Sequence, residues 1–339
     1  MKTCVLLLQL GTPDSPKKSD VRKYLKEFLN DPRVIDLPAY KRKPLVNGII
    51  VPFRAPKSAK IYQELWDMSD GKSPLLVHSV DVKEKLQKKL GDKATVELAM
   101  RYGNPSMDSV MEKIRKDNYD KIVIFPLYPQ YASASTGSCI EKAFKIISKW
   151  WVTPQIETVN QFYDNELFID AIIENANKYN WKDYDHVLFS YHGLPERQLD
   201  KVYKTGLCKD QNCETEFNDT NKFCYKATSY ETTRLIASRL GMTEKDYTVC
   251  FQSRLDDKWV TPYSDAVVEE RAKDGDKKLL VFSPAFVADC LETIIEIGDE
   301  YQEIFEEHGG EKVQLVESLN SNDKWIDSLE DILKPHLAN

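Results

Sequence analysis

The stretch DHVLFSYHGLP, residues 185–195, is an apolar run that ends at a histidine, a glycine and a proline. A short run that is apolar at consecutive positions and rich in β-branched and aromatic residues is typical of a strand buried on both faces of a sheet. Six other runs have the same form. They are TCVLLLQLG (3–11), TVELAMRYG (95–103), KIVIFPLYP (121–129), YTVCFQSRL (247–255), KLLVFSPAF (278–286) and KVQLVES (312–318).

Longer amphipathic stretches separate these predicted strands, and we expect each of them to form a helix. Strands that alternate with helices build a parallel, doubly wound sheet, so the predicted fold class is α/β. The helical stretches are KSDVRKYLKEFLN (18–30), SVDVKEKLQKKL (79–90), DSVMEKIRK (108–116), YETTRLIASRL (230–240), SDAVVEERAKDG (264–275) and NDKWIDSLEDILKPHL (322–337).

The ends of the strands repeat in the same order in both halves of the chain. The motifs LLLQLGTP, ELAMRYG and IVIFPLYP are matched by VLFSYHGLP, TVCFQSRL and LLVFSPAF. Three motifs in matching order favour an internal duplication over the general similarity of α/β strands. We therefore predict two similar Rossmann-like domains, at residues 1–160 and 161–317, and a C-terminal helix, 318–339, that packs back on the first domain.

Composition and charge exclude several classes of protein. The net charge of −7 argues against a general nucleic-acid binder, which would carry a basic domain or stripe. The N-terminal apolar run stops at Gly11, which is too short for a signal peptide, and no apolar run has the length of a membrane span. We expect a cytoplasmic protein whose thiols stay reduced. The sequence leaves the oligomeric state open.

The carboxyl ends of the strands are where an open α/β sheet binds its ligand. Of the five histidines, only His192 directly follows a predicted strand and lies in a Gly-Pro turn at this edge. An imidazole placed there can act as a base near neutral pH or as a metal ligand. We expect the other histidines, His78, His186, His308 and His336, to be structural.

An acidic segment follows the last of the six matching motifs. From Glu292 to Glu311 there are eight carboxylates and no Lys or Arg. On a helix, Glu292, Glu296 and Glu300 would lie along one stripe, beside Asp299. Such a stripe is more often a solvated face than a cation path, but its place opposite His192 favours the second interpretation. Imidazole and carboxylate ligands suit divalent first-row metals, iron(II) among them.

Six motifs together resemble the ferrochelatase family, whose members insert iron(II) into a porphyrin in haem synthesis. They span nearly the whole chain in the family's order, and they are LLLQLGTPDSP, RYGNPSM, FPLYPQYASASTGS, FSYHGLPER, FQSRLDDKWVTPYSD and FSPAFVADCLETIIEI. The resemblance implies a lyase with two Rossmann-like domains around a porphyrin cleft. Its partners would be the porphyrin and Fe2+, both as substrates.

The resemblance also implies roles for particular residues. His192 and Glu292 correspond to the family's active-site histidine and glutamate, where they would catalyse the reaction and hold the iron. Glu296, Asp299 and Glu300 would then carry cations or protons. The residues expected to contact the porphyrin are Leu10, Arg101, Tyr102, Tyr131 and Trp259.

Two positions indicate the porphyrin. The chain has Asp14 where coproporphyrin-using members carry Tyr, and Cys290 where some relatives carry His. Both resemble the protoporphyrin-using bacterial branch, so protoporphyrin IX is the expected substrate and coproporphyrin III the alternative. A non-catalytic porphyrin or metal carrier, or a chelatase for another tetrapyrrole or for cobalt, would be a different function on the same fold.

Residues 198–226 look like an insertion and gather three of the seven cysteines, Cys208, Cys213 and Cys224. The C-x4-C start occurs in one [2Fe–2S] pattern and is tolerated in zinc sites. Three thiolates leave one ligand missing, for which Cys139 is the candidate, because cluster-bearing ferrochelatases take one ligand from that loop region. The options are a [2Fe–2S] cluster, a zinc site or no metal, in that order.

Residues 38–75 have no counterpart in the second half. Their apolar core, LVNGIIVPF, is flanked by Lys and Arg. This composition suits a lip over the cleft or a shallow, peripheral membrane contact. The alternative is a buried segment with charged flanks.

Overall fold

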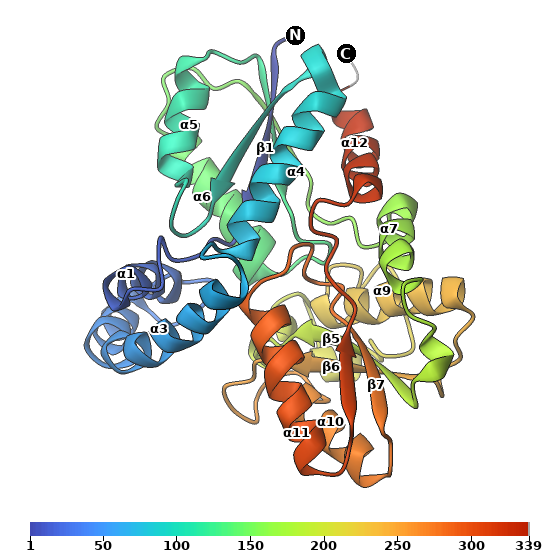
Figure 1. Ribbon diagram of the computed structural model, residues 1–339. Helices are drawn as coiled ribbons and strands as arrows, with labels where there is room; N and C mark the ends of the chain where they lie inside the picture. Colours follow the sequence, from blue (N-terminus) through green and yellow to red (C-terminus); the bar gives the residue numbers. More distant parts are fainter. Residues whose placement is uncertain (338–339) are drawn as a thin grey trace. The chain divides into compact units, whose positions relative to one another are not determined.

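The computed structural model describes residues 1–337 and contains two four-stranded parallel sheets (Figure 1). Their strand orders are β2-β1-β3-β4 and β6-β5-β7-β8, so the first strand of each half lies between the second and the third. The strands are β1 (Thr3–Gln9), β2 (Thr95–Met100), β3 (Lys121–Pro126), β4 (Gln155–Thr158), β5 (His186–His192), β6 (Tyr247–Gln252), β7 (Lys278–Phe282) and β8 (Lys312–Leu315). The predicted α/β fold with two similar parallel sheets is confirmed.

The chain divides into two compact units. Of the described residues, the N-terminal unit comprises 1–128, 133–161 and 329–337, and the C-terminal unit comprises 129–132 and 162–328. The last helix, α12 (Asp323–Leu337), therefore starts in the second unit and ends in the first.

Helices cover the sheet of the N-terminal unit. On one face, α5 (Met107–Lys116) and α6 (Ser138–Ile147) pack against alternate residues of β1, namely Cys4, Leu6 and Leu8. These side chains are at most 1% exposed, as expected for a strand with helices on both faces. The other helices of this unit are α1 (Lys18–Leu29), α2 (Ala39–Pro44), α3 (Val51–Met68) and α4 (Pro74–Leu90).

The sheet of the C-terminal unit is covered in the same way. Leu188 of β5 lies in a core with α10 (Ser264–Lys273) and α11 (Tyr301–Glu307), to which Val268 and Phe305 contribute fully buried side chains. The other helices of this unit are α7 (Glu166–Ala176), α8 (Glu196–Asp200) and α9 (Tyr225–Leu240).

Three features differ from what the sequence predicts. The acidic segment begins as a π-helix, η6 (Glu292–Glu300), and becomes α-helical only at α11. The apolar segment 45–50 is also a π-helix, η1 (Leu45–Ile50), which continues into α3. Strand β4 has no predicted counterpart, because its sequence QIET is short and only partly buried and therefore lacks an apolar run. Among residues 1–337, no helix is both long and apolar enough to cross a membrane.

Candidate active site

The turn after β5 places His192 at the carboxyl edge of the second sheet. His192 is the last residue of β5 and pairs in register with Gln252, the last residue of β6. The next residue must be glycine, because a Cβ on Gly193 would lie 2.7 Å from the Gln252 carbonyl oxygen and 3.2 Å from the Trp259 ring. Gly193 also donates its N–H to that carbonyl at 2.8 Å. The glycine therefore brings the turn against β6 and fixes where the imidazole starts.

The imidazole of His192 is held in one tautomer when it is neutral. Its Nδ1 lies 2.6 Å from the carbonyl oxygen of Gly193. A carbonyl oxygen can only accept a hydrogen bond, so Nδ1 must carry the proton. The lone pair of Nε2 then remains available to accept a proton or to bind a metal. The rings of Trp259 and Phe286 each have their centroid 6.4 Å from that of the imidazole.

Glu296 of η6 is anchored by the residues that end β6. Its carboxylate accepts hydrogen bonds from the Ser253 backbone N–H at 2.8 Å, the Ser253 hydroxyl at 2.5 Å and the Gln252 side-chain amide at 3.1 Å. Ser253 can direct both of its donors to one carboxylate because its backbone is left-handed, with φ of 62°. A non-glycine residue adopts this conformation only where its surroundings enforce it. Glu296 is thus a fixed group rather than a swinging one.

Burial raises the pKa of the Glu296 carboxyl above its usual range. The hydrogen bonds from Ser253 and Gln252 and the charge of His192 act in the opposite direction, whereas the charge of Glu292 adds to the rise. The structure therefore places His192 and Glu292 close enough to Glu296 for their charges to act on its carboxyl. Because burial disfavours the bare carboxylate, this site favours a positive partner, which can be a proton or a metal ion.

The amide of Gln252 connects the strand edge to η6. Its nitrogen also donates to the Glu292 backbone carbonyl at 3.0 Å, and its oxygen accepts from the Ser190 hydroxyl at 2.9 Å. Ser190 in turn lies 2.9 Å from the Ser264 hydroxyl. Since every polar atom of this buried side chain has a partner, the network fixes the start of η6 relative to β6.

The acidic residues of η6 follow a gradient of exposure. Glu292, Glu296 and Asp299 are half-buried, whereas Glu300 is exposed. The expectation of an α-helical stripe is wrong for residues 292–300, because the backbone there has π-helical hydrogen bonds. π-helical turns are frequent at functional sites. The carboxylates nevertheless extend from half-buried Glu296, on which the charge of His192 acts, to exposed Glu300.

The carboxyl edge of the first sheet is closed by a buried ion pair. Arg101 pairs with Asp31 and donates to the Ser138 hydroxyl at 2.7 Å, while its guanidinium lies 4.4 Å from the centre of the Tyr102 ring. Tyr102 is fully buried and donates its hydroxyl to Asp31 at 2.9 Å. Porphyrin contacts of Arg101 and Tyr102 stay predictions, because both side chains here serve this internal network.

The remaining predicted porphyrin contacts are Leu10, Tyr131 and Trp259. Leu10 is half-buried against a core of the N-terminal unit. Tyr131 and Trp259 belong to the C-terminal unit, where Tyr131 packs edge-on to Phe223 with ring centroids 6.4 Å apart. Trp259 lies beside His192.

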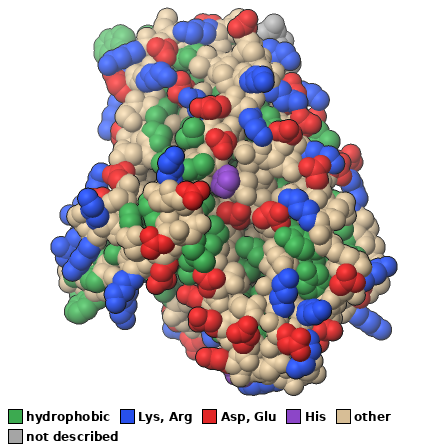
Figure 2. All heavy atoms as spheres, viewed as in Figure 1, with side chains coloured by type: hydrophobic (Ala, Val, Ile, Leu, Met, Phe, Trp, Pro, Cys, Tyr) green, Lys and Arg blue, Asp and Glu red, His purple; other side chains and the backbone are tan. Residues whose placement is uncertain are grey.

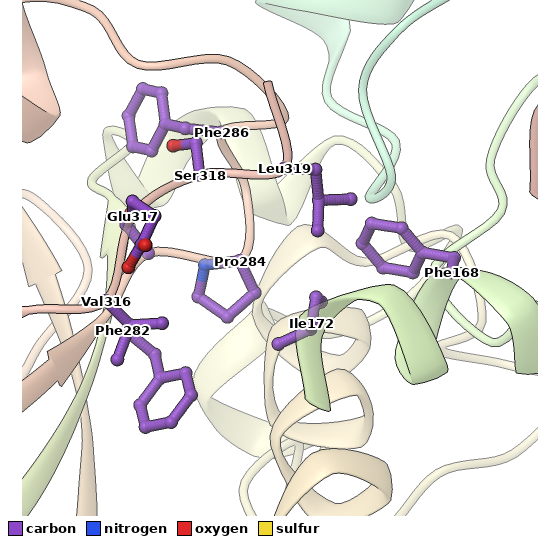
Figure 3. Close-up of a pocket in the computed structure, with 10 residues that line it drawn as sticks. Phe168, Ile172, Phe282, Pro284, Phe286, Val316, Glu317, Ser318 and Leu319 are labelled. Atoms are coloured by element: carbon purple, nitrogen blue, oxygen red, sulfur yellow. The ribbon is translucent and has the colours of Figure 1, made fainter. Parts of the chain in front are cut away.

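A small cavity lies behind Phe286, where β7 ends (Figure 3). Its volume of about 20 Å³ is enough for one water molecule but far too small for a porphyrin. Two lining hydroxyls, of Ser283 and Ser318, are buried without a protein partner. The cavity is therefore suited to a buried solvent molecule and not to the substrate.

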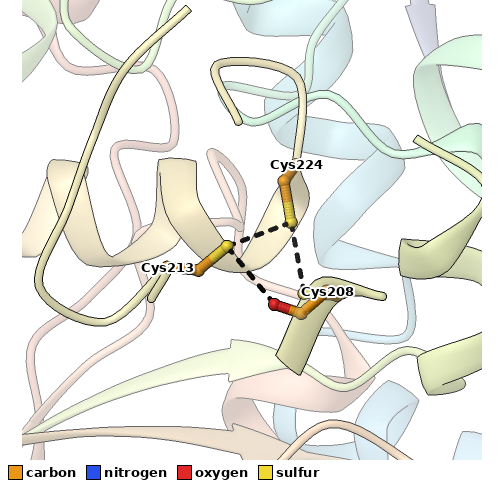
Figure 4. A group of neighbouring side chains, drawn as sticks. All are labelled: Cys208, Cys213 and Cys224. Atoms are coloured by element: carbon orange, nitrogen blue, oxygen red, sulfur yellow. Dashed lines mark hydrogen bonds between the residues drawn. The ribbon is translucent and has the colours of Figure 1, made fainter. Parts of the chain in front are cut away.

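The three cysteines of the insertion converge on one point (Figure 4). The sulfur atoms of Cys208, Cys213 and Cys224 all lie within 4.8 Å of one another, and the three residues are buried. Cys139 belongs instead to the core of the N-terminal unit, where its thiol is fully buried among the side chains of α5 and α6. As the fourth ligand, Cys139 stays a prediction.

Segment 38–75 is amphipathic rather than buried throughout. Val46, Val51 and Ala55 enter a core with α1, whereas Tyr40 and Phe53 are 73% and 74% exposed. On the face drawn in Figure 2, acidic and basic side chains are intermixed.

Three functional candidates have no counterpart in the sequence prediction: Gln252, Ser253 and Asp31. Gln252 and Ser253 directly follow a buried run, so their place at the strand edge could have been found from the sequence. The left-handed backbone of Ser253 and the distant pairing of Asp31 with Arg101 leave no local signal.

Comparison with known proteins gives matches over nearly the whole chain. Residues 2–337 match the family described as Ferrochelatase. A ferrochelatase of Coxiella burnetii (strain Dugway 5J108-111) is 40% identical over 347 residues, covering 99% of this chain and 94% of that protein. A ferrochelatase of Legionella pneumophila (strain Paris) is 42% identical over 338 residues, covering 99% and 100%. The structure of SirB from Bacillus subtilis with Fe3+ has a TM-score of 0.57 and 12% identity, covering 100% and 97%, and supports the fold.

Proposed function

This chain belongs to the ferrochelatase family, and we propose that it inserts Fe(II) into protoporphyrin IX with His192 and Glu292 at the reacting centre. The observation that carries the proposal is the grouping of His192 and Glu292 around Glu296 at one strand edge, with Nδ1 of His192 held at the Gly193 carbonyl. A carrier would have no use for a base at this point, because binding alone releases no proton.

The reaction requires a proton acceptor and a supply of cations. A free-base porphyrin loses two pyrrole N–H protons as Fe2+ enters, so each turnover yields the iron porphyrin and two protons. Nε2 of His192 accepts a proton from the ring, which generates an imidazolium beside Glu292 and Glu296. The nearby carboxylates stabilise that cation.

The acidic residues of η6 provide the exchange path. Glu296 is held by Ser253 and Gln252 and stays in place, while Glu300 reaches the surface. A carboxylate that favours a positive partner can hold Fe2+ on its way in or a proton on its way out. Glu292, Glu296, Asp299 and Glu300 are therefore the proposed relay.

Segment 38–75 is the proposed point of peripheral membrane contact. Its exposed apolar side chains, Tyr40, Ile49 and Phe53, are interspersed with Lys41, Lys43 and Arg54. Exposed aromatic and aliphatic groups next to basic residues suit an anionic lipid surface. Porphyrins are poorly soluble in water, so such a contact would let the substrate arrive from the bilayer.

The test is an anaerobic insertion assay with Fe(II) and either protoporphyrin IX or coproporphyrin III, followed by loss of free-porphyrin fluorescence. We expect turnover of both porphyrins, with a higher kcat and a lower KM for protoporphyrin IX. Faster turnover of coproporphyrin III would reassign the substrate. Tight binding of both porphyrins without metal insertion would overturn the enzyme assignment in favour of a carrier.

A further inference from the structure

The cysteine trio is the strongest cluster of metal-binding side chains outside the candidate active site. Cys208 and Cys224 have their sulfurs 3.5 Å apart, and Cys213 and Cys224 have theirs 3.9 Å apart. All three residues are at most 5% exposed, although the loop that carries them is polar. Both separations are far longer than a disulfide bond. Buried sulfurs that face one another in a polar loop are the arrangement of a metal site.

A [2Fe–2S] cluster does not fit these residues. The cluster takes four cysteine ligands, two on each iron. Here three sulfurs lie within 4.8 Å of one another, which places them around one point instead of dividing them between two irons. The two remaining cysteines of this unit, Cys250 and Cys290, are buried at β6 and before η6, and neither belongs to the group.

A single tetrahedral ion fits the measured separations. With a Zn–S bond of about 2.3 Å, the sulfurs of a tetrahedral site lie about 3.8 Å apart. The observed 3.5 and 3.9 Å bracket that value. Thiolate-rich tetrahedral sites in proteins select zinc, because zinc has no preferred geometry of its own and accepts soft ligands.

Tyr203 brings a side-chain oxygen to the trio. Its hydroxyl lies 3.1 Å from the Cys213 sulfur, a separation close to that between neighbouring ligands of one ion. Tyr203 is half-buried and lies just after α8, at the beginning of the loop that ends at Cys224 and α9. With this oxygen, the three thiolates become a four-ligand set.

The loop around the trio is fixed by buried polar contacts. Asn221 is 1% exposed, donates to the Glu216 carbonyl at 2.8 Å and points the same amide nitrogen at the Cys213 sulfur, 3.9 Å away. The Cys208 N–H donates to the Asp200 carboxylate at 2.9 Å. Donors that face ligand atoms, and contacts that orient the ligands, are typical of the surroundings of a bound metal.

We propose that Cys208, Cys213, Cys224 and the Tyr203 hydroxyl bind one structural zinc ion. This inference concerns a site separate from the reaction and does not depend on the porphyrin chosen. The ion closes the long loop between α8 and α9, which contains only one short 3₁₀ turn, Cys208–Asp210. The polar contacts of Asn221 and Asp200 orient parts of this loop, and the ion would join its two ends.

The zinc site also reaches the catalytic turn. Cys224 is the N-cap residue of α9, and the next residue, Tyr225, is buried and forms a hydrogen bond with the His192 backbone. Ordering Cys224 therefore orders the residue that supports the β5 turn. Loss of the ion should loosen that turn without removing a catalytic group.

The test is metal analysis of the full chain, purified anaerobically from cells supplied with both zinc and iron. We expect about one zinc per chain and no acid-labile sulfide. Titration of the zinc-free protein with Co(II) should give the visible bands of a tetrahedral thiolate site. Cys213→Ser should weaken zinc binding by at least about 100-fold, and Tyr203→Phe by about 10-fold with altered Co(II) bands. Cys250→Ala, a buried cysteine of the same unit, should keep the zinc.

Several outcomes would overturn the proposal. A content of two irons and two acid-labile sulfides per chain would show a [2Fe–2S] cluster at this site instead of zinc. If the protein is isolated without metal and all three thiols of the insertion react freely with a thiol reagent, there is no metal site here. Unchanged zinc affinity and Co(II) bands in Tyr203→Phe would remove Tyr203 from the ligand set. If Cys213→Ser fails to fold, the wild type can be titrated with a mercurial reagent that reacts with thiols. Zinc that is released in step with the reaction of three thiols supports the same assignment. Zinc that is released without any thiol reaction contradicts it.

Discussion

The carboxyl edges of the two sheets have the same backbone plan but carry different chemistry. In the first sheet, Arg101 stacks on Tyr102 and pairs with buried Asp31, so the charges are paired inside the unit. In the second, the corresponding Arg254 stacks 4.1 Å from the Tyr263 ring and pairs with Asp265 near the surface. The second edge adds what the first lacks, an imidazole with a free Nε2.

This difference teaches that the duplicated fold and the reaction are separable. Both sheets place a glycine turn after the first strand and donors to a buried carboxylate at the end of the second, Arg101 and Tyr102 for Asp31 and Ser253 for Glu296, but only the turn of β5 follows a histidine. A fold supplies positions, and function depends on which side chains occupy them. Substitutions at the two edges should therefore differ in kind: loss of turnover at the second and loss of stability at the first.

After the loss of His192 itself, the largest effect on this comparison is expected for Glu292→Gln. The substitution removes the charge next to His192 but keeps the shape, so kcat should fall by about 10²–10³-fold with little change in porphyrin affinity. Anaerobic steady-state kinetics measure the fall, and porphyrin fluorescence titration serves as the control. A normal kcat would remove Glu292 from the reacting centre.

Asp31→Asn tests the other edge. The substitution leaves the Arg101 guanidinium buried without its partner, which should lower the free energy of unfolding by about 3 kcal/mol. Burial raises the pKa of Asp31, but hydrogen bonds from Ser138 and the Arg33 backbone and the charge of Arg101 outweigh it and lower the pKa overall. The wild-type advantage should therefore be present above the ordinary Asp pKa and disappear as the pH falls below it.

Urea unfolding of Asp31→Asn and wild type at neutral and acidic pH measures this difference. The folded variant should keep a kcat near that of the wild type. A large loss of kcat with unchanged stability would show that the first edge takes part in the reaction, and the contrast between the edges would fail.

Ser253→Gly should have a smaller effect on turnover. Glycine adopts the left-handed backbone without strain and keeps the N–H that binds Glu296, so only the hydroxyl donor is lost. We expect kcat to fall about tenfold, as for the loss of one hydrogen bond to a charged group. Ser253→Ala lacks the same hydroxyl and should be less stable than Ser253→Gly by about 1 kcal/mol, because the Cβ of alanine disfavours the left-handed backbone at this position. Equal stability of the two variants would contradict the enforced backbone.

The smallest expected effect lies at the amino end of β5. Burial lowers the pKa of His186 to about 4, so the folded state favours the neutral ring. The unfolded chain takes up a proton below its ordinary pKa of about 6.5, and stability should decline as the pH falls from there towards 4. Between pH 7 and 5, wild type should lose about 1 kcal/mol more than His186→Gln. If the free energy of unfolding changes equally with pH in wild type and His186→Gln, this prediction is wrong.

The sequence predicts most of the fold because buried strands leave a strong signal. The strands that end at Gln9 and His192 are mostly apolar and almost entirely buried, since helices cover both faces of their sheets. Strand β4 escapes prediction because an edge strand of four partly buried residues needs no apolar run. The π-helix at Glu292 is also hidden, since acidic residues four apart suit an α-helix equally well.

The site is only partly predictable for a different reason. His192 and Glu292 are identified by their motifs, but what holds Glu296 is a backbone conformation at Ser253 and an amide at Gln252. These depend on long-range packing of β6 against η6, which no local pattern encodes. Likewise, the spacing of Cys208, Cys213 and Cys224 indicates a metal, whereas the nearby oxygen of Tyr203 is visible only in three dimensions.

The most direct test of the central claim is porphyrin binding and iron insertion measured on the same anaerobic sample of wild type and His192→Ala. The account predicts that the variant binds protoporphyrin IX with nearly unchanged affinity but inserts iron about 10²–10⁴-fold more slowly, as expected for the loss of a general base. Normal insertion by His192→Ala would contradict the account, because the proton acceptor would then have to lie elsewhere than at the edge of the second sheet.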